Sequence, residues 1–169
     1  QPESLRSACA SLASEGRVPD VVFWVAGVYS PMQSWNFDPY EAERTLRINL
    51  LSCYHGLHQV LRLWEDNPNA SRQPHLVWVS SVAGYRGLPL AMAYGAGKAA
   101  LNQLAEINYL ELRPRGIGVS LVLPGFVKTR LTADTGANAH ENGAPGAIDS
   151  LRLHEAVDGL TEELKDAWM

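Results

Sequence analysis

Two residues near the middle of the sequence have the types and spacing needed for acid/base chemistry. Tyr94 and Lys98 are four residues apart in a segment with helical composition, and this spacing places both side chains on one face of a helix. A phenol has an ordinary pKa of about 10 and is a poor base at neutral pH. Because a close ammonium group favours the phenolate, we expect Lys98 to lower the pKa of Tyr94 towards the range useful in catalysis.

Ser81 is a third candidate for the same site. It precedes Tyr94 by 13 residues and follows the apolar run 76–79, which predicts a buried strand. Its hydroxyl could hold a carbonyl or alcohol oxygen beside the phenol. A Tyr-x-x-x-Lys spacing arises by chance, and a Ser after a strand is often only a cap or turn residue. The conjunction of the three residues is what indicates a site of proton transfer.

Two other kinds of site are not supported by the sequence. The run Gly95-Ala96-Gly97-Lys98 resembles part of a phosphate-binding loop, but that motif requires Gly where Met92 stands and Ser or Thr where Ala99 stands. His55 and His58 are one helical turn apart, but the histidines lack the spacing of metal ligands. We therefore expect no metal site.

Helices and strands are predicted to alternate around these residues. The apolar pattern predicts helices over 5–13, 39–64 and 93–112, and strands over 21–26, 76–79 and 119–123. Gly16 is expected to end the first helix. Asp38 and Glu41 have the spacing of a capping box around Pro39, which predicts the start of the second helix. The strand over 21–26 is apolar throughout and is expected to be fully buried.

This alternation predicts an α/β fold with a parallel sheet and helices on both faces. Right-handed crossovers place the carboxyl ends of all the strands at one edge of the sheet, where such folds bind ligands. Ala26-Gly27, Ser81 and Pro124-Gly125 all follow strands. We therefore expect these segments to converge on one site.

Composition limits the kinds of function that are plausible. The chain has 169 residues, of which 46% are hydrophobic, with a formal net charge of -4 and no Lys/Arg-rich run. This favours one globular domain and argues against a nucleic-acid partner. No apolar run reaches the roughly 18 residues of a membrane span, and no signal-like start is present, so we expect a cytoplasmic protein. Cys9 and Cys53 are expected to be buried free thiols.

Four stretches of the sequence resemble the short-chain dehydrogenase/reductase family. They occur in the family's order between about residues 18 and 132. The stretches are Ile48-Asn49-Leu50, Val79-Ser80-Ser81-Val82-Ala83-Gly84, Ala93-Tyr94-Gly95-Ala96-Gly97-Lys98-Ala99-Ala100 and Leu123-Pro124-Gly125-Phe126-Val127-Lys128-Thr129. The resemblance implies a Rossmann-like, doubly wound parallel sheet in three α/β/α layers.

The resemblance also implies roles for four catalytic residues. Tyr94 would give or take the proton at the substrate oxygen, and Ser81 would orient that oxygen. Lys98 would bind the nicotinamide ribose and lower the pKa of Tyr94. Asn49 would help to hold a water in a proton relay behind Lys98. Asn is a mediocre residue inside a helix, so a local kink is expected at Asn49.

The cofactor implied by the resemblance is NAD or NADP, which would exchange hydride with a small carbonyl or alcohol substrate. Ser81, Tyr85 and Tyr94 would contact the substrate, and Arg86 and the 133–149 loop would help to line its pocket. The residues implied to contact the cofactor are Ala26, Gly27, Tyr94, Lys98, Pro124, Gly125, Val127 and Thr129.

The sequence departs from the family pattern in three places, one of which is the tail, since Asp134 to Met169 show no family pattern. No Gly-rich turn precedes residue 21, so the strands that carry the dinucleotide-binding turn are not in the sequence. We expect a longer chain, with an isolated fragment as the alternative. Val25 stands where the family usually has Asn. Residues 1–132 are therefore interpreted as the C-terminal part of a Rossmann-like domain with its active site, and 133–169 as its substrate-loop region and terminal helix.

The functional hypothesis is an NAD(P)(H)-dependent alcohol/carbonyl oxidoreductase. The alternative is a catalytically silent nucleotide-sensing or scaffold protein of the same fold, or a non-functional fragment. The predicted helices carry apolar residues on more than one face, including Leu50, Tyr54, Leu101 and Leu104. We therefore expect a homodimer or homotetramer.

Overall fold

The structure is a computed structural model that describes residues 2–67, 70, 73–125, 127–128 and 148–149. The chain forms two compact units, Gln1–Leu123 and Pro124–Met169, which are described separately below. No helix in the described ranges is long and apolar enough to cross a membrane.

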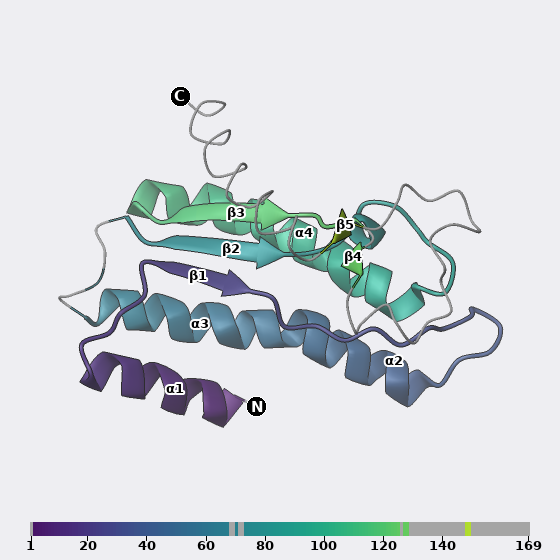
Figure 1. The fold of residues 1–169 in the computed structure, drawn as a ribbon, viewed down its shortest axis with the longest axis horizontal. Helices are drawn as coiled ribbons and strands as arrows, with labels where there is room; N and C mark the ends of the chain where they lie inside the picture. Colours follow the sequence, from purple (N-terminus) through teal and green to yellow (C-terminus); the bar gives the residue numbers. More distant parts are fainter. Residues whose placement is uncertain (1, 68–69, 71–72, 126, 129–147, 150–169) are drawn as a thin grey trace. The chain divides into compact units, whose positions relative to one another are not determined.

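The first unit alternates helices and strands as the sequence predicts (Figure 1). Its elements are α1 (Pro2–Ser14), β1 (Val21–Trp24), α2 (Pro39–Leu46), a π-helical turn (Arg47–Leu51), α3 (Ser52–Glu65), β2 (His75–Val79), a 3-10 turn (Val82–Gly84), α4 (Met92–Leu112), a second 3-10 turn (Arg113–Arg115) and β3 (Gly118–Val122). The three predicted strands and three predicted helical segments are therefore confirmed. The difference is that the π-helical turn divides the segment predicted as one helix over 39–64.

The three strands form a parallel sheet in the order β1-β2-β3. The register pairs Val22 with Leu76 and Leu76 with Val119, and all three arrows point the same way in Figure 1. The carboxyl ends of the strands therefore meet at one edge, as predicted. The parallel α/β arrangement is confirmed.

One face of this sheet forms the core with α3 and α4. Side chains at paired positions share a face, and the residues from strands that pack in the core are Val22, Trp24, Leu76, Trp78, Val119 and Leu121. Cys53 and Val60 of α3 and Leu101 and Leu104 of α4 belong to the same cluster. Both helices therefore lie on the same side of the three strands.

The contact between β1 and α3 depends on a glycine. Trp24 lies edge-on to Trp78, with ring centroids 6.3 Å apart. A Cβ atom at Gly56 would lie 2.3 Å from the Trp24 ring. Since real side chains do not approach that closely, any larger residue at Gly56 would force Trp24 out of the core.

The opposite face of β1 corrects a prediction. The run 21–26 was expected to form a fully buried strand, but Val21 and Phe23 are each 47% exposed, and Val25 beyond the strand is 62% exposed. The reason is that β1 is the edge strand of the described sheet and the core cluster lies on its other face. A continuous apolar run does not reveal which face of a strand is covered.

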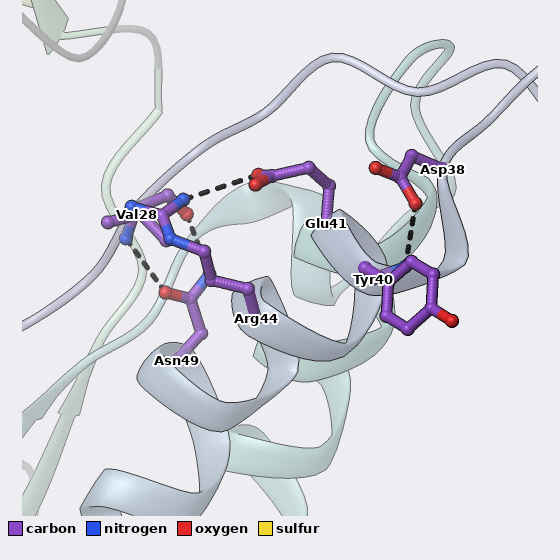
Figure 2. A network of polar contacts seen from close by, with 6 residues as sticks. All are labelled: Val28, Asp38, Tyr40, Glu41, Arg44 and Asn49. Carbon is purple, nitrogen blue, oxygen red and sulfur yellow. Dashed lines mark hydrogen bonds and ion pairs between the residues drawn. The ribbon is translucent and has the colours of Figure 1, made fainter.

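The starts and ends of the helices follow from local sequence, with one correction. Asp38 caps α2 by accepting a 2.9 Å hydrogen bond from the backbone N–H of Tyr40, with Pro39 in the first turn (Figure 2). Glu41 was expected to close a capping box, but its carboxylate instead pairs with Arg44 at 3.3 Å. A neighbouring cation on the helix surface thus draws the carboxylate away from the cap. Gly16 follows α1 with a φ of 66°, as predicted for a helix stop.

The second unit contains two short described strands, β4 (Val127–Lys128) and β5 (Ile148–Asp149). They pair in parallel, with Val127 opposite Ile148. Thr129 and the predicted terminal helix lie outside the described residues, as does the 133–149 loop apart from Ile148–Asp149.

Candidate active site

The π-helical turn between α2 and α3 places Asn49 in the interior. A π turn adds one residue to the helical repeat and locally breaks the regular hydrogen-bond ladder, and such turns are common at functional sites. Asn49 lies in the middle of the turn and is completely buried. The kink predicted at Asn49 is therefore confirmed.

The side chain of Asn49 binds the segment that follows β1. Its Nδ2 donates to the carbonyl oxygen of Val28, and its Oδ1 accepts from the backbone N–H of Val28, both at 2.8 Å (Figure 2). The amide therefore pairs with both polar groups of one backbone residue, as a neighbouring strand would. This double hydrogen bond fixes the segment after β1 against the π-helical turn.

Lys98 points into the interior from α4. Its Nζ donates a 2.8 Å hydrogen bond to the carbonyl oxygen of Val79, the last residue of β2, and the residue is only 4% exposed. Burial lowers the pKa of Lys98, and the Cys53 thiol acts in the opposite direction. Lys98 therefore carries its charge at the carboxyl edge of the sheet, where little solvent reaches it.

Tyr94 lies one turn before Lys98, as predicted, but its pKa differs from the expectation. The Nζ of Lys98 is 5.7 Å from the centre of the Tyr94 ring. Burial raises the pKa of Tyr94, and a hydrogen bond with Ser81 works against this rise. The lowering expected from Lys98 is not found in this structure, because the ammonium group is directed to Val79 and the phenol is half-buried.

Ser81 and its neighbour Ser80 follow β2 and have different partners. Ser81 accepts a 3.2 Å hydrogen bond from the backbone N–H of Ala83 and so caps the first 3-10 turn. Ser80 is buried and donates at 3.1 Å to the backbone carbonyl of Lys98. Gly84 allows this turn to lie against α4, because a Cβ there would be 2.6 Å from the backbone carbon of Lys98.

Gly27 leaves space in front of two buried polar residues, Asn49 and Lys98. A Cβ atom at Gly27 would lie 3.5 Å from Oδ1 of Asn49 and 3.8 Å from Nζ of Lys98. The structure therefore brings Gly27, Asn49, Ser81, Tyr94 and Lys98 together. Ala26, the residue before Gly27, is exposed.

Tyr85, a further predicted contact in the first unit, does not join this group. Tyr85 is 78% exposed and lines a hollow of about 350 Å³ with Arg86 and Met92, which neither Ser81 nor Tyr94 lines. Pro124, Gly125 and Val127 belong to the second unit.

Two residues at the site were not predicted from the sequence. The ring of Tyr29 lies edge-to-face against Tyr94, with centroids 5.2 Å apart and planes at 78°. Cys53, one turn after Asn49, donates at 3.3 Å to the Asn49 carbonyl and interacts electrostatically with Lys98. A signal for Tyr29 was available, because it follows Gly27 by two residues at the carboxyl end of a strand.

The thiols and histidines show no further site in the described ranges. Cys53 is buried and free, as expected, whereas Cys9 is also free but only partly buried. Among the described residues, no group of three or more His, Cys, Asp and Glu side chains is placed to hold a metal ion.

Comparison with known proteins places this geometry in context. The chain is 31% identical over 111 residues to the rhamnolipids biosynthesis 3-oxoacyl-[acyl-carrier-protein] reductase of Pseudomonas aeruginosa, which covers 64% of this chain and 41% of that protein. It is 48% identical over 62 residues to an uncharacterized oxidoreductase of Myxococcus xanthus, covering 37% of this chain and 24% of that protein. The chain thus spans less than half the length of these relatives.

Solved structures show the same fold. The RhlG/NADP active-site complex of Pseudomonas aeruginosa superposes with a TM-score of 0.70 at 26% identity, over 78% of this chain and 52% of that chain. A 4-hydroxyisoleucine dehydrogenase complexed with NADH gives a TM-score of 0.76 at 20% identity, over 95% of this chain and 69% of that chain. The Rossmann-like fold class is therefore confirmed.

The match to a whole family covers most of the chain. Residues 2–140 match the family of short chain dehydrogenases, and this range contains the kinked helix, both serines after β2 and the Tyr94–Lys98 turn. The chain belongs to the short chain dehydrogenase family of oxidoreductases.

Proposed function

We propose that this chain carries the catalytic centre of an NAD(P)(H)-dependent oxidoreductase that interconverts an alcohol and a carbonyl compound. The observation that carries the proposal is the arrangement around Tyr94. Ser81 acts on the pKa of its phenol, and a buried ammonium group, that of Lys98, lies 5.7 Å from its ring on the same helix. A proton donor, an orienting hydroxyl and a fixed cation are the groups that this reaction needs.

The residues around Lys98 fit a nicotinamide cofactor. The bare backbone of Gly27 leaves room beside Asn49 and Lys98 that a Cβ atom would partly fill. The ammonium group of Lys98 would bind the ribose, and Ala26, Gly27 and Tyr94 would complete the contacts from the first unit. Pro124, Gly125, Val127 and Thr129 are proposed to contact the nicotinamide. When bound, NAD or NADP would supply or accept the hydride.

In this mechanism Tyr94 transfers the proton at the substrate oxygen. Because burial raises its pKa, the phenol is protonated at neutral pH and can act as an acid towards a carbonyl oxygen. Ser81 would donate a hydrogen bond to that oxygen and hold it beside Tyr94. Asn49 would hold a relay water behind Lys98, so that the phenolate is reprotonated.

The substrate is proposed to be a small carbonyl or alcohol compound. Tyr85 and Arg86 would line its pocket together with the 133–149 loop. The Pseudomonas relative is named for reduction of a 3-oxoacyl group, a ketone of this chemical type.

We further propose a cytoplasmic homodimer or homotetramer. Leu101 and Leu104, two of the residues expected at an interface, are instead buried against the sheet. Tyr54, however, is exposed, and so are Leu51, Ile107 and Leu110 along the helices. These apolar side chains would form the subunit contact.

The experiment compares Tyr94→Phe with the wild type in the full-length protein. NADH or NADPH oxidation is followed with a panel of small ketones, and cofactor binding is followed by fluorescence. Removing the phenol hydroxyl should lower turnover about 1,000-fold and leave cofactor binding within about twofold. The exposed Tyr40→Phe is the matched control and should retain full turnover.

The possible outcomes separate the hypotheses. Unchanged turnover in Tyr94→Phe would exclude the proposed mechanism. Cofactor binding without turnover of any ketone would favour the catalytically silent nucleotide-sensing protein instead.

A further inference from the structure

The segment after β1 is bound to the loop that leads into α4. The backbone N–H of Met32 donates a 2.9 Å hydrogen bond to the carbonyl oxygen of Leu90, and Met32 pairs with Ala91 in an isolated parallel bridge. Met32 is also buried. Residues 29–32 therefore contact the chain immediately before the helix that carries Tyr94.

Leu90 has a strained backbone at this point. Its φ is 65°, and among the described residues it is the only non-glycine residue with a positive φ. A β-carbon is disfavoured in this region, so such a conformation persists only where the surroundings impose it. Since α4 begins at Met92, the strained peptide lies two residues before the catalytic helix.

Tyr29 contacts both the strained peptide and the catalytic side chain. Its hydroxyl donates to the carbonyl oxygen of Leu90 at 3.4 Å, and its ring lies edge-to-face on Tyr94. The hydrogen bond is long, but it adds a second donor to an oxygen that Met32 already binds. One side chain thus spans the distance from Leu90 to Tyr94.

Tyr29 can keep its proton while Tyr94 changes its charge. Burial raises the pKa of Tyr29, and the negative charge of ionised Tyr94 raises it further. When Tyr94 is ionised, its charge therefore favours the protonated form of Tyr29, which remains a hydrogen-bond donor to Leu90.

We propose that Tyr29 is a positioning residue for Tyr94, which holds the strained start of α4 through Leu90 and fixes the phenol by its edge-to-face contact. The inference rests on the proposed function only in that Tyr94 is taken as the acid/base group. Tyr29 itself does not transfer a proton, and it acts through the orientation of Tyr94.

A double-mutant cycle in the full-length protein tests the contact with Leu90. Tyr29→Phe keeps the ring but removes the hydroxyl, and it should lower kcat about fivefold with KM nearly unchanged. In Leu90→Gly the positive φ is no longer strained, so adding Tyr29→Phe should cost less than about twofold. An equal loss in both backgrounds, or no loss in either, would overturn the role at Leu90. Tyr40→Phe is again the control.

The contact with Tyr94 is tested without turnover. Titration of 13C-labelled tyrosines by NMR, with Tyr94 assigned from the Tyr94→Phe spectrum, follows its phenol directly. Tyr29→Ala uncovers the Tyr94 ring and should lower its pKa, while Tyr29→Phe should leave that pKa nearly unchanged. An unaltered Tyr94 signal in Tyr29→Ala would exclude the positioning role. If the NMR shifts are found but no substrate is turned over, the proposed function fails and the positioning role stands.

Discussion

The two ends of the site differ in how firmly their polar groups are held. At the inner end, Asn49, Cys53, Ser80 and Lys98 are all buried, and each donates to a backbone carbonyl. At the outer end, Tyr29 and Tyr94 are half-buried, and with them we group Tyr85, which lines a separate hollow and is mostly exposed. Tyr29 and Tyr94 contact each other through their rings.

Because of this difference, we expect the inner end to matter mainly for stability and the outer end mainly for turnover. A buried polar group without a partner is costly, so the inner end is stable only as a fully paired set. The outer end loses little when one side chain changes, and it is free to adapt to a substrate. Substitutions at the inner end should therefore mainly change stability, and those at the outer end should mainly change turnover.

The largest effect on stability is expected from Asn49→Ala. This change removes two 2.8 Å hydrogen bonds and leaves both polar groups of Val28 without their partner. The free energy of unfolding should fall by about 3 kcal/mol, measured by urea denaturation with tryptophan fluorescence. The comparison variant at the outer end, Tyr85→Ala, should change it by less than about 0.5 kcal/mol. Similar losses in the two variants would remove the distinction between the ends.

The next effect is a dependence of stability on pH at the inner end. Burial raises the pKa of the Cys53 thiol from its ordinary 9.0 to about 11. Between these values the unfolded chain releases the proton and the folded chain keeps it. The unfolded state therefore binds fewer protons, and the free energy of unfolding falls as the pH rises, by about 2–3 kcal/mol once the pH exceeds both values.

Cys53→Ala should abolish this fall, as measured by urea denaturation from pH 8 to the highest pH at which the protein folds. Burial lowers the pKa of Lys98, and deprotonation of its ammonium stabilises the fold as the pH rises. Because Lys98 is present in both the wild type and Cys53→Ala, the free energies of unfolding of these two proteins are compared at each pH. Cys9→Ala is the control, and its effect should be smaller because Cys9 is only partly buried. Identical curves for wild type and Cys53→Ala would contradict the prediction.

The sequence predicts those features of the site that depend on local geometry. Tyr94 and Lys98 share a face because of helical spacing, Ser81 lies near them because strand ends converge, and Asn49 kinks its helix because it is poorly suited to a regular one. Each of these features follows from one element or from the order of elements.

The remaining features depend on tertiary contacts that no local pattern encodes. The partner of Lys98 is a backbone carbonyl of Val79, and any residue at that position supplies the same oxygen. The pairing of Tyr29 with Tyr94 depends on how the segment after β1 returns to α4. The exposure of Phe23 likewise depends on which strand lies at the edge of the sheet.

A smaller change in stability than those of Asn49 and Cys53 is predicted for two adjacent serines that divide between the ends. Ser80→Ala removes a buried 3.1 Å hydrogen bond to the Lys98 carbonyl and should lower the free energy of unfolding by about 1 kcal/mol, with turnover nearly intact. Ser81→Ala should change stability less, because its longer 3.2 Å bond from Ala83 lies within one short turn, but it should lower turnover about 100-fold if Ser81 orients the substrate oxygen. Urea denaturation and ketone reduction measured on both variants give the two quantities. The two residues are neighbours with the same side chain. If both variants lose stability and turnover to the same extent, the boundary between the two ends does not lie between Ser80 and Ser81.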